Sequence, residues 1–366
     1  MSVNFFLPTK VLLEEDCVKK NAAIFKGFGK KALIVTGRRS ARANGSLQDV
    51  TDALASQEIA YAVYDRVDAN PTIANVREGA AFAKENAADF VIGIGGGSPM
   101  DAAKAIALLS CQELSDSALF AGTYGPDILP LILLPTTAGT GSEVTQYSIL
   151  TNDSAQSKTS IATPLLFPKV AMVDAKYTLA LPIKTTINTA IDALSHSIEG
   201  MLSTKANSLT DLLAADSIAK ISANFKKLLS GEVDAACRAD LIYASTLGGI
   251  VIAHTGTTAV HSMGYSLTYF HHIDHGRANG LLLTAFCRFI ERQNAAFIRR
   301  LLDIMGIADV AAFGTVLSQL LGEKEKIEKN EFEKFAAIAI KAKNIPNCII
   351  VPTQQDLCDI YAESFS

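Results

Sequence analysis

The 366-residue sequence has little of several features that would place it in a specialised class of protein. Its six cysteines are scattered and form no Cys-x-x-Cys pair. This pattern argues against a disulfide framework or a zinc knuckle and favours reduced thiols in a cytoplasmic protein. The net charge is −4 and no basic stripe is present, so nucleic acid is not an expected partner.

Long apolar runs are also missing. No uninterrupted run approaches the ~20 residues needed to cross a bilayer. The first eight residues are uncharged at their start and broken by Pro8, so a secretory signal is not expected there. Neither observation favours a membrane as a partner.

What the sequence does contain is mostly apolar. Hydrophobic residues make up 49% of the chain and charged residues 19%, as in a well-packed globular protein. The chain is too long for one compact core, and two domains are expected on a prior of ~100–200 residues each.

In residues 1–180, short apolar strands alternate with helix-like stretches. Strands are predicted at 32–36, 61–64, 90–94 and 129–134, with helices at 46–56, 73–86 and 99–109. Shorter β segments are predicted at 147–151, 158–161 and 170–173, and an edge strand within 5–13. This alternation predicts an α/β domain with a Rossmann-like parallel sheet, which binds a dinucleotide at the carboxyl ends of its strands.

After about residue 180, apolar residues recur every three or four positions. Helices are predicted at 185–202, 207–229, 237–256, 280–293, 297–306 and 331–343. We therefore expect an all-α domain over residues 181–366. The charged run 323–330 is expected to be a solvated loop or helix edge.

A glycine-rich segment, Gly-Ile-Gly-Gly-Gly-Ser-Pro-Met-Asp at 93–101, lies between a predicted strand and a predicted helix. Three consecutive glycines allow backbone N–H groups to approach an anion closely. Ser98 can cap the helix, and Pro99 suits its first turn. The helix N-terminus then favours a pyrophosphate, with an ordinary strand–helix turn as the alternative.

Two further turns follow predicted strands. Residues 135–145 are rich in hydroxyl groups and glycine, which suit ribose and phosphates, although a plain loop is equally compatible. Gly37, Arg38, Arg39 and Ser40 follow the first strand without an acidic residue. Dinucleotide sites hold the adenosine 2′-OH with an acid, whereas arginine accommodates a 2′-phosphate. The segment therefore favours NADP over NAD, unless its arginines are simply exposed on a turn.

Asp192 and His196 are four residues apart on a predicted helix. Their Cβ atoms are therefore about 5–6 Å apart on one helical face. A carboxylate and an imidazole placed in this way form half of a metal site, or else a helix-surface pair. Five of the six histidines lie between residues 254 and 275. One carboxylate and three imidazoles would suit Fe(II) or Zn(II), but spacing does not select which histidines bind.

With these motifs assembled, the chain resembles the iron-containing (group III, metal-dependent) alcohol dehydrogenase family along essentially its whole length. GGGSPMD at 95–101, PTTAGTGSEVT at 135–145, DALSHSIEG at 192–200 and HSMGY with HG at 261–276 occur in the family's order and spacing. Bacterial 1,3-propanediol and short-chain alcohol dehydrogenases are the most similar members by this resemblance. It implies a two-domain architecture like that of dehydroquinate synthase.

The resemblance also implies roles for individual residues. The four metal ligands would be Asp192, His196, His261 and His275. The pyrophosphate loop would include Gly96, Gly97, Ser98 and Asp101. The nucleotide would also be lined by Thr136, Thr137, Thr140, Asn70 and Lys158, with Gly37, Arg38 and Ser40 near its adenosine.

The chain departs from the family pattern at three positions. Many members have aspartate, linked to NAD preference, where this chain has Gly37, and this difference supports NADP. Many carry a further histidine at the position of Tyr265, proposed for proton transfer, and a proline at the position of Asp274. The proton route is therefore open, with Lys158, Tyr265 and His271 as the candidate catalytic residues.

We predict a metal-dependent alcohol dehydrogenase that moves hydride reversibly between NADP(H) and a small primary alcohol, diol or aldehyde. A bound metal would act as a Lewis acid on the substrate oxygen. The alternatives are a glycerol or other polyol dehydrogenase and, less favoured, a dehydroquinate synthase-like lyase, which needs more cationic residues near the metal than 185–280 contains. A homodimer in the cytoplasm is expected.

Overall fold

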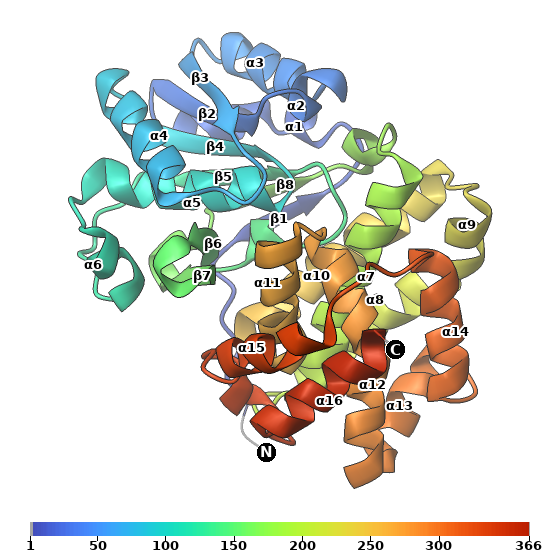
Figure 1. Cartoon of the computed structure of the whole chain (residues 1–366). Helices are drawn as coiled ribbons and strands as arrows, with labels where there is room; N and C mark the ends of the chain where they lie inside the picture. The colour runs from blue at the N-terminus through green and yellow to red at the C-terminus, as the bar shows by residue number, and fades with distance from the viewer. Residues whose placement is uncertain (1–2, 366) are drawn as a thin grey trace. The chain divides into compact units, whose positions relative to one another are not determined.

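The computed structural model describes residues 3–365, which divide into two compact units (Figure 1). An α/β unit spans Leu7–Ala180, and a helical unit begins at Leu181. The described residues before Leu7 belong with the helical unit, which differs from the predicted domain of residues 1–180. The reason is a local anchor, because the Phe6 backbone N–H donates to His254 Nε2 at 3.0 Å and the Phe5 ring stacks on the same imidazole.

The α/β unit contains a six-stranded sheet in the order β1-β8-β5-β4-β2-β3, and every strand pair in it is parallel. The strands are β1 (Lys10–Leu13), β2 (Lys31–Gly37), β3 (Ala60–Val67), β4 (Phe90–Gly95), β5 (Leu131–Pro135) and β8 (Val170–Val173). An antiparallel hairpin of β6 (Tyr147–Asn152) and β7 (Ser157–Ala162) is separate from this sheet. The parallel α/β prediction is confirmed.

Two strands begin later than predicted. β5 begins at Leu131 rather than at residue 129, and the residue before it, Pro130, has no N–H to donate to a ladder. Of the predicted edge strand within 5–13, only Lys10–Leu13 is a strand. It does lie at an edge of the sheet, where it pairs with β8.

Helices cover both faces of the sheet (Figure 1). They are α1 (Cys17–Lys20), α2 (Ser40–Ala43), α3 (Ser46–Ser56), α4 (Ile73–Glu85), α5 (Gly97–Cys111) and α6 (Asp116–Ala121). Side chains alternate along β2, so Leu33 joins the core cluster that contains Val76 of α4, whereas Ile34 joins the one that contains Val50 of α3. Burial of both faces explains why the strands are nearly continuous in apolar residues.

The helical unit is built from ten helices among the described residues. They are α7 (Ile183–Met201), α8 (Ser208–Ala223), α9 (Phe225–Ser230), α10 (Ala235–Thr255), α11 (Ala259–His271), α12 (His275–Gln293), α13 (Ala295–Met305), α14 (Val310–Leu321), α15 (Lys329–Ala339) and α16 (Gln354–Phe365). The predicted helix 207–229 is in fact two helices that meet at Asn224. Helices α11, α14 and α16 were not predicted. Most of α11 is buried, so it lacks the apolar–polar alternation that marks an amphipathic helix.

Helix α10 is long and apolar enough to cross a membrane by length and composition, with a mean hydropathy of 1.3 in its most apolar window. Since 72% of that window is buried inside the protein, the helix has the character of a core helix. Helices α13 and α14 are long and apolar enough to cross a membrane only when taken together as one segment, which is bent by 52°.

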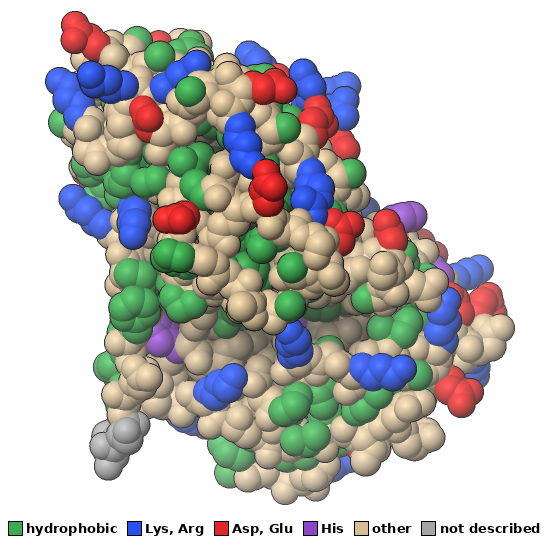
Figure 2. Space-filling view, turned by 90° about the vertical axis from the view of Figure 1, so that its left-hand side faces the viewer, with side chains coloured by type: hydrophobic (Ala, Val, Ile, Leu, Met, Phe, Trp, Pro, Cys, Tyr) green, Lys and Arg blue, Asp and Glu red, His purple; other side chains and the backbone are tan. Residues whose placement is uncertain are grey.

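On the face shown in Figure 2, basic side chains are interspersed with acidic ones rather than gathered in one stripe.

The charged run after α14 is mostly exposed, as predicted, but one of its members has a structural role. Glu325 accepts a hydrogen bond of 2.6 Å from Nε of Arg277, a buried residue of α12. The same guanidinium donates to the backbone oxygens of Leu321 and Glu323. Arg277 therefore ties this loop to the first turn of α12.

Candidate active site

Three helices of the helical unit bring together one carboxylate and two imidazoles. Asp192 of α7, His261 of α11 and His275 of α12 each offer one ligand atom, and these atoms lie within 4.8 Å of one another. Asp192 Oδ1 is 3.7 Å from His261 Nε2 and 3.8 Å from His275 Nε2. The spacing suits an ion that binds such ligands at about 2.0–2.2 Å. The His275 side chain is 22% exposed, whereas the other two are buried.

His196 lies beside this cluster but is not among the three residues whose ligand atoms lie within 4.8 Å of one another. Its ring stacks on that of His261, with 4.6 Å between centroids and 22° between planes. It follows Asp192 by one helical turn on α7. Its role as the fourth ligand stays a prediction.

The Asp192 carboxylate favours its ionised form. Burial raises its pKa, but the charges of His196, His275 and His261 and a hydrogen bond from Asn279 outweigh that effect, so the pKa is lowered.

Glu199, which has no predicted role, contacts His261 of this cluster. It is fully buried, and its carboxylate accepts a hydrogen bond from Nδ1 of His261. It also accepts from the Thr258 backbone N–H at 2.8 Å and the Thr258 hydroxyl at 2.7 Å. Protonation of Nδ1 leaves the Nε2 lone pair of His261 directed at the cluster. The signal in the sequence was spacing, because residues 192, 196 and 199 share one helical face.

Two candidate proton-transfer residues of the helical unit have different surroundings. The Tyr265 ring stacks on that of His275, with 5.3 Å between centroids and 15° between planes, so it lies next to the cluster. His271 instead pairs through Nε2 with Glu331 of α15 at 3.1 Å and meets Phe335 edge-on. These contacts hold His271 against α15.

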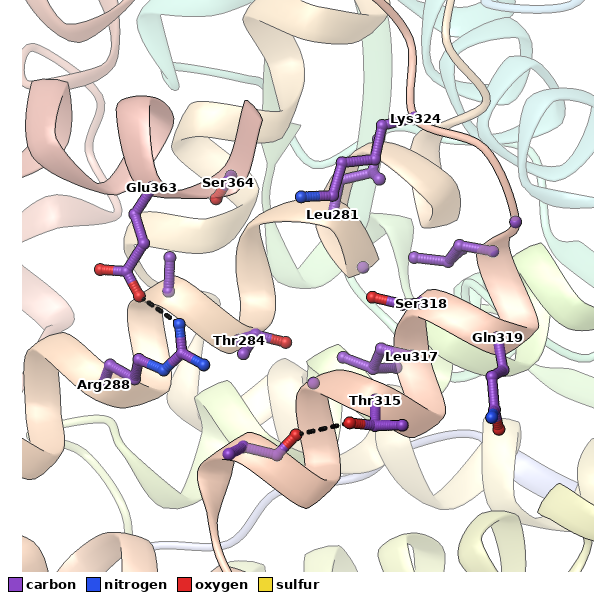
Figure 3. A pocket seen from close by; sticks show the side chains of 16 residues that line it. Leu281, Thr284, Arg288, Thr315, Leu317, Ser318, Gln319, Lys324, Glu363 and Ser364 are labelled. Atoms are coloured by element: carbon purple, nitrogen blue, oxygen red, sulfur yellow. Dashed lines mark hydrogen bonds and ion pairs between the residues drawn. The ribbon is translucent and has the colours of Figure 1, made fainter. Parts of the chain in front are cut away.

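A cavity of about 490 Å³ lies elsewhere in the helical unit, between α12, α14 and α16 (Figure 3). Its polar lining includes Thr284, Lys324 and Arg288, which pairs with Glu363 at 2.7 Å. None of the four predicted metal ligands lines it.

In the α/β unit, the helix that follows the predicted pyrophosphate loop begins earlier than predicted. Helix α5 starts at Gly97, its N-cap is Gly96, and no side chain caps it. The predicted capping role of Ser98 is therefore wrong, because Ser98 lies within the first turn and its Oγ accepts from the Asn70 N–H at 3.2 Å. The first turn retains the backbone N–H groups that bind anions.

Residues 135–145, called here the threonine-rich turn, lie directly against the predicted pyrophosphate loop. A Cβ atom on Gly97 would be 2.6 Å from Thr140 Cγ2, so only glycine permits the observed approach. A Cβ on Gly96 would be 3.1 Å from Thr137 Oγ1, and the Thr136 N–H donates to the Gly95 carbonyl at 2.8 Å. The structure thus brings the predicted threonines to the phosphate loop.

Asp101 is engaged within the unit. Its carboxylate accepts from the Ser142 hydroxyl at 2.7 Å and from the Ile149 N–H at 3.2 Å. Burial raises its pKa, against opposing effects led by the charge of Lys104. These contacts join Asp101 to the turn of residues 135–145 and to β6, and its role toward the cofactor stays a prediction.

Lys104 is a second buried residue that the sequence analysis did not single out. Its Nζ donates to the Ser142 carbonyl at 2.7 Å, the Thr145 hydroxyl at 3.1 Å and the Tyr147 carbonyl at 2.7 Å. Burial lowers its pKa to about 8, although the charges of Asp101 and Glu143 oppose the shift. Lys104 thereby fastens the threonine-rich turn to α5.

The remaining predicted cofactor residues lie at the ends of other elements. Arg38 forms an exposed pair with Asp68 at 3.2 Å, and Ser40 begins α2. A Cβ on Gly37 would have no neighbour closer than 3.7 Å, so a side chain fits there. Lys158 lies on β7.

Comparison with known families decides the assignment. Residues 8–175 match the family described as iron-containing alcohol dehydrogenase, and residues 186–365 match the C-terminal region of the Fe-containing alcohol dehydrogenase family. The chain belongs to the iron-containing alcohol dehydrogenase family. It is therefore an oxidoreductase that acts on alcohols, and the family prediction is confirmed.

Individual proteins are similar to this chain along most of their length. The chain is 30% identical over 362 residues to alcohol dehydrogenase 4 of Schizosaccharomyces pombe, which covers 98% of this chain and 82% of that protein. It is 34% identical over 282 residues to lactaldehyde reductase of Escherichia coli K12, and the match covers 76% of this chain and 73% of that protein.

Among solved structures, an iron-containing alcohol dehydrogenase from Thermotoga maritima is 36% identical, with a TM-score of 0.93 over 100% of this chain and 99% of that one. A 1,3-propanediol oxidoreductase is 28% identical, with a TM-score of 0.90 over 100% of both chains. The fold of the chain is therefore that of the family.

Proposed function

We propose that this protein transfers hydride reversibly between NADP(H) and a small primary alcohol, diol or aldehyde, with Fe(II) held by Asp192, His196, His261 and His275. Zn(II) and NAD are the alternative cofactors. The observation that carries the proposal is the convergence of a buried carboxylate and two imidazoles from three helices within 4.8 Å.

The donor set fits such an ion. It combines one carboxylate with nitrogen donors and contains no thiolate. When bound, the ion would supply Lewis acidity to a substrate oxygen. With Nδ1 bonded to Glu199, the neutral imidazole of His261 presents its Nε2 lone pair, and the side chain of His275 is 22% exposed.

The preference for NADP is supported by the end of β2. Gly37 supplies no carboxylate to hold a 2′-OH, and Arg38 is an exposed cation. Its partner Asp68 is also exposed, so a 2′-phosphate can compete for the guanidinium. Two similar structures are an NADH-dependent butanol dehydrogenase and a sulfoacetaldehyde reductase in complex with NAD⁺, which makes the cofactor choice a matter for measurement.

For the proton route, Tyr265 is supported best, because its ring lies on that of His275. Lys158 stays a candidate on β7. His271 has weaker support, since Glu331 already pairs with its Nε2.

The lyase alternative requires cationic side chains near the metal. Among the described residues of the helical unit, two arginines are buried, and both are engaged elsewhere. Arg238 donates to Thr186 and to the Leu181 carbonyl, and Arg277 pairs with Glu325. These contacts favour the dehydrogenase proposal.

The proposal is tested by following NADPH absorbance with iron-reconstituted protein, prepared anaerobically, across two- to four-carbon aldehydes. Metal-dependent NADPH oxidation is expected, and its absence with all of them would refute the proposal. Glycerol and propanediols in the reverse direction distinguish a polyol dehydrogenase. His275→Ala should lose both metal and turnover, and full metal content in this variant would refute the ligand assignment.

We also propose a cytoplasmic homodimer. Two features of the described residues support it: the cysteines are all free, and β1 is an edge strand that pairs only with β8. Analytical ultracentrifugation tests the oligomeric state.

A further inference from the structure

Helix α5 contacts both halves of the threonine-rich turn. The first half lies against the helix N-terminus, where a Cβ atom on Gly97 would be 2.6 Å from Thr140 Cγ2. In the second half, Nζ of Lys104 donates to the carbonyl and hydroxyl oxygens of Ser142 at 2.7 and 2.9 Å and to the Thr145 hydroxyl at 3.1 Å. Gly97 and Lys104 are seven residues apart, so they share one face of α5. That face therefore holds the turn at two places.

The second half of the turn has little regular structure of its own. Residues Ser142–Val144 form a 3₁₀ helix of three residues, which follows Gly141 with a φ of +60°. Such short helices have poorer hydrogen-bond geometry than α-helices. Strand β6 begins at Tyr147, whose carbonyl also accepts from Lys104, at 2.7 Å. Lys104 therefore bridges the irregular stretch between the threonines and the hairpin.

A lysine is a costly residue at this position. Lys104 is fully buried, and burial of a cation is unfavourable unless hydrogen bonds and opposite charges compensate for it. The charged groups around it are Asp101 on the same helix and Glu143 in the turn, and the hydroxyl of Ser142 donates to Asp101 at 2.7 Å. An apolar residue would fill the space without that cost, so the bonds to the turn account for the lysine.

We propose that Lys104 is a positioning residue for the cofactor, which holds Thr137 and Thr140 of the threonine-rich turn over the N-terminus of α5. This inference rests on the proposed function, since it takes the turn and the predicted pyrophosphate loop as the NADP(H) site. It assigns a role to a residue outside the predicted cofactor set.

The protonation of Lys104 supplies a second readout. Burial lowers its pKa to about 8, although the charges of Asp101 and Glu143 oppose the shift. The ammonium offers three N–H donors and the neutral amine two. The turn is therefore held most firmly below pH 8, and the affinity for NADPH should fall as pH rises through that value.

The test measures the Kd for NADPH from the fluorescence of its nicotinamide. Lys104→Met removes the donor at nearly constant length, and its Kd should be about tenfold higher than that of the unmodified protein, as for lost hydrogen bonds to a charged group. KM for NADPH should rise by a similar factor, with a much smaller change in kcat at saturating NADPH. The Kd of this variant should also vary less between pH 7 and 9.5. Thr145→Val removes one acceptor, should weaken binding by a smaller factor, and carries the test if the methionine variant does not fold.

The matched control is Leu108→Ala, one turn further along α5. Leu108 is also fully buried, but it belongs to the apolar core and has no polar side-chain atom to bond to the turn. This variant loses stability and should keep the original Kd. An unchanged Kd in the folded variant that carries the test, or an equal loss in Leu108→Ala, would overturn the inference. Failure of the unmodified protein to bind NADPH would instead overturn the proposed function.

Discussion

The buried carboxylate of Glu199 accepts a hydrogen bond from Nδ1 of His261, so a residue outside the predicted ligand set determines which nitrogen of that histidine can bind a metal. The same carboxylate also accepts the N–H and hydroxyl of Thr258 at the start of α11. Glu199 thus joins α7 to α11 at the point where both helices contribute donors.

Changing Glu199 should therefore weaken metal binding. Glu199→Ala removes the partner of Nδ1 and leaves His261 free to take either tautomer, so we expect metal affinity to fall about 10- to 100-fold. Glu199→Gln keeps an acceptor oxygen and should lose less. Titration with Zn²⁺ against a competing chelator measures both, and Asp240→Asn, which removes an acid paired with Lys220, serves as the control. Equal affinity in all four proteins would show that the Glu199 contact has no bearing on the metal.

Metal binding should also stabilise the protein against heat. A ligand that binds only the folded state at 100 times its Kd adds about 2.7 kcal/mol to the free energy of unfolding. Differential scanning calorimetry with and without a saturating divalent metal should show a higher Tm with the metal. His275→Ala should lose this shift. A metal-dependent shift of equal size in that variant would place the ion elsewhere.

Gly37→Asp should move cofactor preference from NADP toward NAD. The substitution fits without backbone strain, since the nearest atom to a Cβ there is the Val67 carbonyl oxygen at 3.7 Å. The new carboxylate can hold a 2′-OH and repels a 2′-phosphate. The ratio of kcat/KM for NADPH to that for NADH should fall by about one order of magnitude or more, equivalent to roughly 1.4 kcal/mol. The matched control is Gly27→Asp, because a Cβ at Gly27 would have no atom within 4 Å and the residue has no predicted role in cofactor binding.

Lys104 should make stability depend on alkaline pH. Its pKa is lowered from 10.5 to about 8 by burial, so between these values the unfolded chain binds more protons than the folded one. The free energy of unfolding contributed by this group therefore rises with pH from about 8 to 10.5, and the contribution is lost as pH falls through the folded pKa. Urea unfolding across this range should show a more positive slope against pH in the unmodified protein than in Lys104→Met. Identical slopes would show that Lys104 is not the group responsible.

Local sequence was sufficient for much of the α/β unit. Apolar runs that end at glycine or proline predicted β2, β4 and β5, since burial on both faces needs nearly continuous apolar residues. The spacing of Asp192 and His196 likewise placed a carboxylate and an imidazole on one face of α7, because helical periodicity is a property of the chain itself.

Tertiary packing decided what sequence left open. Of the histidines between 254 and 275, the packing of α7, α11 and α12 brings His261 and His275 to Asp192, whereas α15 takes His271 through Glu331. The contacts of Glu199 and Asn279 depend on the same packing. These partners are distant along the chain, and no local periodicity encodes which faces of separate helices meet.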